Sequence, residues 1–394
     1  MISLRRYAVF ASAMALLLLL GGYFHEPIVS QAKYRFGKKI PLAAQPGDTP
    51  IEVTPVGPFR WDTVSTQYPI PTPLVQLPAG PAKKLPKVQF DFPREIAEHA
   101  TKREERQAAV HRSFERCWQA YKQHAWGHDE LAPLSGGARD GFGGWAASLV
   151  DNLDNLWIMG MKEEFSEAVE KAIAIDLGLS TTETINVFET TIRHLGGLLA
   201  AYDVSGDKRL LDKAKEFGEM LLKAFDTPNR LPITRWVLCL SWDDKKWRDE
   251  VKSRHSEKVD IDEAIKELRL PEGFTDIADR RYILRPEAIE SVFILYRITG
   301  EQRYQDAAWD MFMAITNATT TQLANAALSD ITYSPAELAQ GTTGGTTQFD
   351  SMESFWMAET LKYFYLIFSE PDLISLDEFV FNTEAHPFKR MLPA

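Results

Sequence analysis

From about Glu95 onward the chain repeats an apolar pattern that favours helices. Leu149, Leu153 and Leu156 recur three or four positions apart, which places them on one face of a helix. Links such as Ser205–Asp207 are short, and tight links between helices produce helical hairpins. The sequence therefore predicts an all-α body. Segments with this pattern are 103–123, 145–160, 187–199, 210–225, 287–298, 303–315 and 352–368.

One stretch breaks the helical pattern. Residues 237–242 form a strand-like apolar run, and a charged run at 243–269 follows it. Taken alone, the apolar run is consistent with either a buried strand or a turn between two helical halves.

The N-terminal segment is typical of a membrane anchor. Arg5 and Arg6 precede an uncharged span of eighteen residues at 7–24, at the short end of what crosses a bilayer as a helix. Arginines before the span and none directly after it predict a cytoplasmic tail at 1–6 and a lumenal body. A cleaved signal peptide is the alternative, and either route brings the body into the secretory pathway.

A proline-rich region follows the predicted anchor. Twelve of the 22 prolines lie between 41 and 93, where they disfavour helices and sheets. We therefore expect an extended, partly polyproline stem over 25–94, before a folded domain at 95–394. The alternative is a disordered linker without a spacing role, which in physical terms differs little from such a stem.

Charge and cysteine content narrow the class of protein. The net charge of −11 argues against a nucleic-acid partner, which requires a basic face. Cys117 and Cys239 allow one disulfide but no disulfide framework. The fold must therefore depend mainly on its core, for which an apolar content of 45% is sufficient.

Three acid-bearing stretches lie far apart in the sequence, each inside or beside an apolar helical pattern. They are Phe-Glu-Thr-Thr-Ile-Arg at 188–193, Arg-Pro-Glu-Ala-Ile-Glu at 285–290 and Phe-Asn-Thr-Glu-Ala-His-Pro at 381–387. Carboxylates cost free energy when they enter a core, so several in such settings predict a buried polar pocket.

Six motifs, in order along the chain, carry a resemblance to a known family. Trp126–Leu131 reads WGHDEL, and Leu149–Trp157 is similar to an LxDxLDTLW signature, with Asn155 in place of Thr. Further similar segments are 186–197, 284–291, 351–363 and 380–387. On these motifs the chain resembles glycoside hydrolase family 47, the class I α-1,2-mannosidases. The resemblance covers about 95–236 and 243–391, and it implies an (αα)7 toroid of helical hairpins with the active site at its base.

The chain also departs from the family pattern. Family members carry a long block between the hairpin that ends near Trp236 and the region before Arg285, and this block holds a catalytic Asp. No such segment occurs here. We therefore expect an internal deletion with its seam near 236–243, an incomplete helical ring and no third catalytic acid.

The resemblance assigns two catalytic carboxyls. Inverting glycosidases use one carboxylic acid to protonate the leaving oxygen and a second carboxylate to activate water. By resemblance Glu189 is the general acid, Arg193 its pocket partner, and Glu287 the base. From the residues alone, an i,i+4 ion pair at a helix surface is the commoner interpretation of Glu189 and Arg193. Glu287 is equally a first-turn acid that the helix dipole stabilises.

The resemblance also implies a calcium ion at the base of the barrel. Thr383 would offer its carbonyl and hydroxyl oxygens, and the ion would keep several waters. A plain loop turn is the alternative for Thr383, and a core position is the alternative for Phe355. The remaining substrate-binding candidates by resemblance are Arg285, Glu290, Glu353, Phe355, Glu359 and Glu384.

The function that the resemblance predicts is calcium-dependent, inverting hydrolysis of terminal α-1,2-linked mannose from high-mannose N-glycans. The expected location is the membrane of the endoplasmic reticulum or Golgi, with the catalytic domain in the lumen. Two alternatives stay open because of the missing block. One is a glycan-binding quality-control factor for misfolded glycoproteins, and the other is an inactive truncated product.

Overall fold

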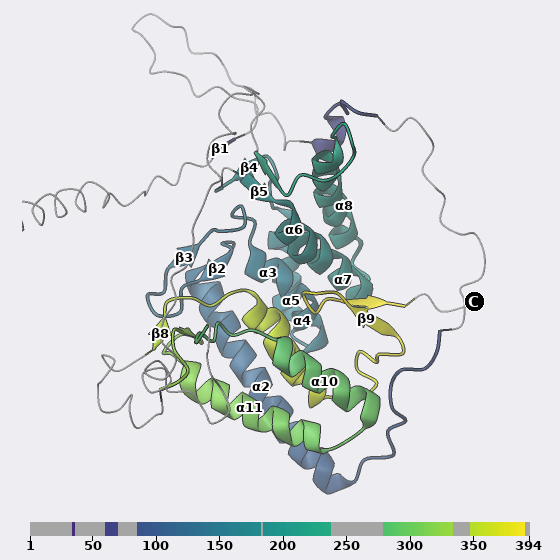
Figure 1. Cartoon of the computed structure of the whole chain (residues 1–394), viewed down its shortest axis with the longest axis vertical. Helices are drawn as coiled ribbons and strands as arrows, with labels where there is room; N and C mark the ends of the chain where they lie inside the picture. Colours follow the sequence, from purple (N-terminus) through teal and green to yellow (C-terminus); the bar gives the residue numbers. More distant parts are fainter. Residues whose placement is uncertain are drawn as a thin grey trace, which may run out of the picture. The chain divides into compact units, whose positions relative to one another are not determined.

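Helices predominate in the part of the chain that the structure describes, and they are joined either by short turns or by longer loops that carry short strands (Figure 1). The computed structural model describes residues 34–35, 60–69, 85–182, 184–237, 279–333 and 347–390. The all-α class that the periodicity predicts is confirmed. The principal helices are α2 (Ala97–His124), α3 (Ala147–Asp151), α4 (Leu153–Ile158), α5 (Lys162–Ile173), α6 (Val187–Glu189), η2 (Thr190–Leu195), α7 (Gly196–Ser205), α8 (Lys208–Leu222), α10 (Glu287–Thr299), α11 (Arg303–Thr319), η4 (Trp356–Thr360) and α13 (Leu361–Ile367), with short 3-10 turns η1 (Trp61–Thr63) and η3 (Lys223–Phe225).

Strands within the described ranges are two or three residues long and pair in antiparallel twos. The strand-like run expected at 237–242 begins at the end of β6, and 238–242 lies outside the described residues. The pairs are β1 (Tyr34–Arg35) with β4 (Leu179–Ser180), β2 (Glu130–Leu131) with β3 (Ala138–Arg139), β5 (Thr184–Asn186) with β6 (Arg235–Val237), β7 (Ala327–Leu328) with β8 (Gln348–Phe349), and β9 (Phe379–Phe381) with β10 (Pro387–Lys389).

Two hairpins end their first helices at glycines in the left-handed conformation. Gly206 closes α7 with φ +77°, and Gly300 closes α10 with φ +71°. Glycine adopts this conformation without the steric cost that other residues meet. A Cβ on Gly300 would also lie 2.3 Å from the Phe90 ring. In the first hairpin Asp207 then caps α8, because its carboxylate accepts from the Arg209 amide at 3.0 Å.

The core forms where α13 packs against α2, α10 and α11. Trp118, Trp356 and Phe364 are completely buried there. Each such side chain contributes about 1.5–3 kcal/mol of hydrophobic stabilisation. Cys117 is likewise buried with a free thiol, and Cys239 lies outside the described residues.

Two pieces of the proline-rich region lie against the helical body. Asp226 accepts from the amides of Gln67 and Tyr68, both at 2.7 Å, which holds 60–69 beside the end of α8. Asp377 accepts from the amides of Val88 and Gln89 at 2.6 and 3.1 Å. One carboxylate therefore clamps two consecutive amides at each place.

Large apolar side chains are exposed at the end of the α7–α8 hairpin, just before the predicted seam. Leu222 and Leu231 are each 64% exposed, and Phe225 is 44% exposed. Exposed apolar faces at this edge agree with the incomplete ring that the missing block predicts.

The predicted anchor at 7–24 lies outside the described residues, as does most of the stem predicted at 25–94. Within the described ranges, no helix combines the length and apolar character that a bilayer span requires.

Candidate active site

Arg193 is the centre of a buried polar cluster. Its Nε donates to Glu189 at 2.8 Å, and its Nη1 donates to Ser354 at 2.8 Å and to Glu384 at 2.9 Å. Nη1 also lies 3.4 Å from Asp151 Oδ2. Burial lowers the pKa of Arg193, but the charges of these three carboxylates outweigh it and raise the pKa above its ordinary value. Arg193 thus joins two of the three predicted acid-bearing stretches.

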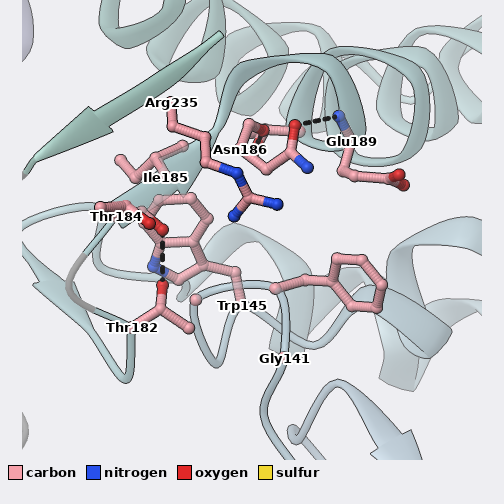
Figure 2. A pocket seen from close by; sticks show the side chains of 11 residues that line it. Gly141, Trp145, Thr182, Thr184, Ile185, Asn186, Glu189 and Arg235 are labelled. Carbon is pink, nitrogen blue, oxygen red and sulfur yellow. Dashed lines mark hydrogen bonds between the residues drawn. The ribbon is translucent and has the colours of Figure 1, made fainter. Parts of the chain in front are cut away.

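The helix that carries Glu189 begins at the site. Asn186 Oδ1 accepts from the Glu189 amide at 3.3 Å, which caps α6 (Figure 2). The wider π-helical turn η2 follows at once, a feature frequent at functional sites. The i,i+4 ion pair that the spacing allows does form, but Arg193 is 6% exposed and does not lie on a helix surface.

Glu384 and Glu359 are two buried carboxyls in direct contact. Burial raises the pKa of both, and the charge of Glu384 adds to the effect on Glu359. The nearby Asp151 adds to the effect on Glu384, and the two carboxyls share a hydrogen bond. Arg193 and His386 oppose the rise at Glu384, so Glu359 is the carboxyl that more strongly favours its protonated form.

Phe355 links this cluster to the stretch at 285–290. The Arg193 guanidinium carbon lies 6.0 Å from the ring centroid, and that of Arg285 lies 5.3 Å away. Arg285 in turn donates to Glu287 at 3.1 Å. Phe355 is only 5% exposed, whereas Glu287 is 62% exposed. Glu290 is half-buried beside Tyr363, and burial raises the pKa of its carboxyl.

Glu353 interacts with a carboxyl that sequence reasoning missed. Glu130, in the WGHDEL motif, is buried, and Glu353 forms a hydrogen bond with it. Burial and the charge of Glu353 raise the pKa of Glu130, and Arg193 partly opposes this. The place of Glu130 in the WGHDEL motif was the signal available in the sequence.

Thr383 lies exposed in the turn between β9 and β10. The Asn382 side chain fixes this turn by accepting from the amides of Glu384 and His386 at 3.0 and 2.9 Å. Ala385 adopts a left-handed φ of +56° within it. The third acid-bearing stretch therefore presents Thr383 to solvent while it buries the next residue, Glu384.

A cavity of about 240 Å³ opens beside Glu189. Figure 2 shows the side chains of Trp145, Arg235 and Glu189 around it, with the Arg235 guanidinium directed inward. The lining combines hydroxyl, amide, charged and aromatic groups, a mixture suited to a polyhydroxylated ligand. Its residues are Gly141, Phe142, Gly143, Trp145, Thr182, Thr184, Ile185, Asn186, Glu189, Thr190 and Arg235.

Comparison with known proteins decides the family. A model described as glycosyl hydrolase family 47 matches residues 113–258 and 239–390. The chain belongs to glycosyl hydrolase family 47. The two matched stretches of the family 47 model overlap at 239–258, next to the seam expected near 236–243.

Proteins named as mannosidases are similar to this chain over most of its length. Mannosyl-oligosaccharide 1,2-alpha-mannosidase MNS1 of Arabidopsis thaliana is 26% identical over 484 aligned positions, covering 80% of this chain and 83% of the relative. The human endoplasmic reticulum mannosyl-oligosaccharide 1,2-alpha-mannosidase is 27% identical and covers 73% of this chain, which spans 64% of the human protein. Since 80% of 394 residues is about 315, many of the 484 positions aligned with MNS1 have no counterpart here.

The family 47 fold is also evident in a solved structure. The alpha-1,2-mannosidase from Trichoderma reesei matches with a TM-score of 0.60 at 21% identity, covering 73% of this chain and 99% of that one. The predicted (αα)7 architecture is therefore confirmed as the fold.

Buried polar residues outside the three stretches extend the buried polar cluster. Asp151 and Asp154 belong to the Leu149–Trp157 signature, and both are fully buried. Asp154 pairs with Lys362 at 2.9 Å and with His386 at 3.0 Å. Acids inside an apolar helical stripe were the available signal for both aspartates. Lys362 gave none, because its position in the sequence resembles an ordinary polar helix position.

Proposed function

We propose that this family 47 protein hydrolyses terminal α-1,2-linked mannose from high-mannose N-glycans with inversion. Family membership and the names of its relatives support the substrate class. The single observation that carries the proposal is the position of Arg193, which contacts Glu189 and Glu384 across 191 residues of sequence. This contact places a partly exposed carboxyl beside a cavity and against a buried polar cluster.

In this proposal Glu189 protonates the leaving oxygen and Glu287 accepts a proton from the attacking water. Glu189 lines the cavity and is reachable by a ligand, with 25% of its side chain exposed. Glu287 is exposed and belongs to a different helix. It pairs with Arg285, which lies against the Phe355 ring, and Phe355 in turn lies next to the cluster that holds Glu189. The proposed sugar contacts are Arg193, Arg285, Glu290, Glu353, Phe355, Glu359 and Glu384.

The residues around Thr383 fit a hydrated calcium ion. The available donors are hard oxygens, namely the Thr383 hydroxyl and carbonyl, with the Glu359 and Glu384 carboxyls close by. Arg193 already opposes the raised pKa of Glu384, and a further cation nearby would favour ionisation of Glu359 as well. Within the described ranges, no three acidic, His or Cys side chains form a direct metal cage, so the ion would keep several waters. When bound, calcium would supply positive charge for orienting a sugar and water.

We also propose that the chain is a lumenal enzyme of the endoplasmic reticulum or Golgi, anchored through residues 7–24. The location in the names of mammalian relatives supports the organelle. The charge pattern at Arg5 and Arg6 supports the orientation.

A second function, glycan binding without turnover, is favoured by two specific observations. The catalytic Asp segment expected by resemblance is absent. Glu287, the proposed base, is 62% exposed and is held by one exposed arginine, so it lacks the rigid support that preorganised chemistry requires.

Mannose release from a high-mannose glycan, with calcium or with EDTA, tests the first function. We expect release with calcium, none with EDTA, and a loss of about 10²–10⁴-fold in Glu189→Gln, since that variant cannot act as an acid. Calcium-dependent retention of the wild type on an immobilised glycan, without any release, would instead establish the second function.

A further inference from the structure

Lys362 is a completely buried cation that touches the turn carrying Thr383. Its Nζ donates to the Ala385 carbonyl at 2.8 Å and to Asp154 Oδ2 at 2.9 Å, and both ionic side chains are 0% exposed. A buried ammonium is costly unless good partners surround it. Lys362 therefore fixes α13, α4 and the β9–β10 turn relative to one another.

His386 extends this contact from the other end of the turn. Its Nδ1 lies 3.0 Å from the same Asp154 oxygen, and its side chain is completely buried. The glycines of α7 admit it closely, because a Cβ on Gly196 or Gly197 would lie 3.2 or 3.3 Å from the imidazole. The turn is therefore held against the helix that follows Glu189 and Arg193.

The backbone of the turn needs this support. Ala385 has a left-handed φ of +56°, which is sterically unfavourable for a residue other than glycine. Such conformations persist only where surrounding contacts determine them. The carbonyl that Lys362 binds belongs to this same residue.

We propose that Lys362 is a positioning residue that holds Thr383 in place for calcium, acting through Asp154 and the Ala385 carbonyl. The proposal rests on the proposed role of Thr383. Lys362 itself reaches neither sugar nor ion, since it is completely buried behind the turn. Its contribution is to keep the hydroxyl and carbonyl of Thr383 in one arrangement.

The test compares Lys362→Met with Arg297→Met in the full chain. Arg297 is an equally buried cation that donates to the Leu366 and Leu373 carbonyls at 2.9 and 3.2 Å. Both variants lose a buried charge and some stability, but Lys362 alone of these two contacts the turn. Calcium affinity is measured by isothermal titration, and protection of 379–390 by hydrogen exchange.

We expect calcium binding to weaken at least tenfold in Lys362→Met, with faster exchange across 379–390, while Arg297→Met keeps wild-type affinity and protection. If Lys362→Met does not fold, Asn382→Ala frees the turn without removing a buried charge and should weaken calcium binding likewise. Wild-type calcium affinity in a folded Lys362→Met overturns the proposal, and so does equal weakening of calcium binding in Arg297→Met. Where Asn382→Ala replaces Lys362→Met, wild-type calcium affinity in Asn382→Ala has the same meaning. If the wild type binds no calcium, the calcium assignment fails. In that case hydrogen exchange across 379–390 in Lys362→Met, or in Asn382→Ala as its substitute, is the one measurement that decides the positioning role.

Discussion

Arg193 Nη1 lies 2.9 Å from Glu384 Oε2, although 191 positions separate the two residues in the chain. The contact is fully shielded, since Arg193 and Glu384 are each 6% exposed. It makes the helix after Glu189 and the turn at Thr383 parts of one structural unit. Any proposed catalysis at Glu189 therefore depends on how well this guanidinium is held.

Arg193→Lys should lose both stability and activity. A lysine presents one point charge and cannot reproduce the fork that contacts Glu189, Ser354 and Glu384. Leaving buried carboxylates unpaired costs about 3–5 kcal/mol. Displacement of Glu189 should reduce mannose release about a hundredfold. Urea unfolding and glycan assays measure the two effects.

Arg281→Lys is the matched control for Arg193→Lys. Among the described residues, Arg281 is 57% exposed and pairs locally with Asp279, so its change should stay within about 0.5 kcal/mol. Equal effects in the two variants would mean that the buried cluster has no special role.

The helices could be predicted from the sequence because each depends on a local period that its own residues display. The predicted segment 287–298 corresponds to α10 at Glu287–Thr299, and 303–315 to α11 at Arg303–Thr319. Only part of the candidate site could be predicted from the sequence. Glu189, Arg193 and Glu384 were identified through family motifs, and the structure brings them together. Lys362 was missed because its partner Asp154 lies 208 residues away, and no local pattern encodes such a pairing.

The free energy of unfolding should fall below pH 6.5 because of His194. This side chain is completely buried between Phe217 and Trp145. Burial lowers the pKa of His194 to about 4. Between pH 6.5 and 4 the unfolded chain therefore binds more protons than the folded chain, so stability decreases as the pH falls.

His194 should lower the free energy of unfolding by on the order of 3 kcal/mol as the pH falls across that window, and it should have no such effect at pH 7 and above. His194→Phe keeps the stacked ring but cannot be protonated, so its unfolding free energy should vary less between pH 6.5 and 4. The exposed His99→Gln serves as the control and should keep the wild-type slope in urea titrations. An unchanged slope in His194→Phe would show that other groups cause the decline.

Gly197→Ala should destabilise the protein, whereas Gly218→Ala should stabilise it. A Cβ on Gly197 would lie 2.8 Å from the Val150 carbonyl oxygen, and backbone cannot move aside easily. Overpacking of this kind costs about 1–3 kcal/mol. At Gly218, inside α8, nothing lies within 4 Å of the added carbon, so the gain in helix propensity should be about 0.5–1 kcal/mol. Opposite shifts in thermal midpoint are expected, and shifts of the same sign would contradict the close packing of α7.

Asp226→Ala should loosen the proline-rich region without unfolding the helical body. The carboxylate accepts from the Gln67 and Tyr68 amides, and hydrogen bonds to a charged group contribute about 1.5–3 kcal/mol each where water is excluded. Here the amides are exposed, so water replaces the lost acceptor and the global effect should be about 1 kcal/mol or less. The local effect should be largest at Gln67 and Tyr68, because Asp226 holds both amides, while Lys223 still donates to the Val64 carbonyl and Trp61 stays buried.

Limited proteolysis and hydrogen exchange measure that local effect. In Asp226→Ala the segment 60–69 should exchange faster, while 85–92 should not change, because its own clamp at Asp377 is intact. Asp377→Ala should show the reverse pattern, and Asp310→Ala, an exposed aspartate on α11, should change neither segment. Release of both segments by either single change would mean that the two clamps act as one unit. The proline-rich region would then be a cooperative part of the folded domain, not a stem attached to it at two independent points.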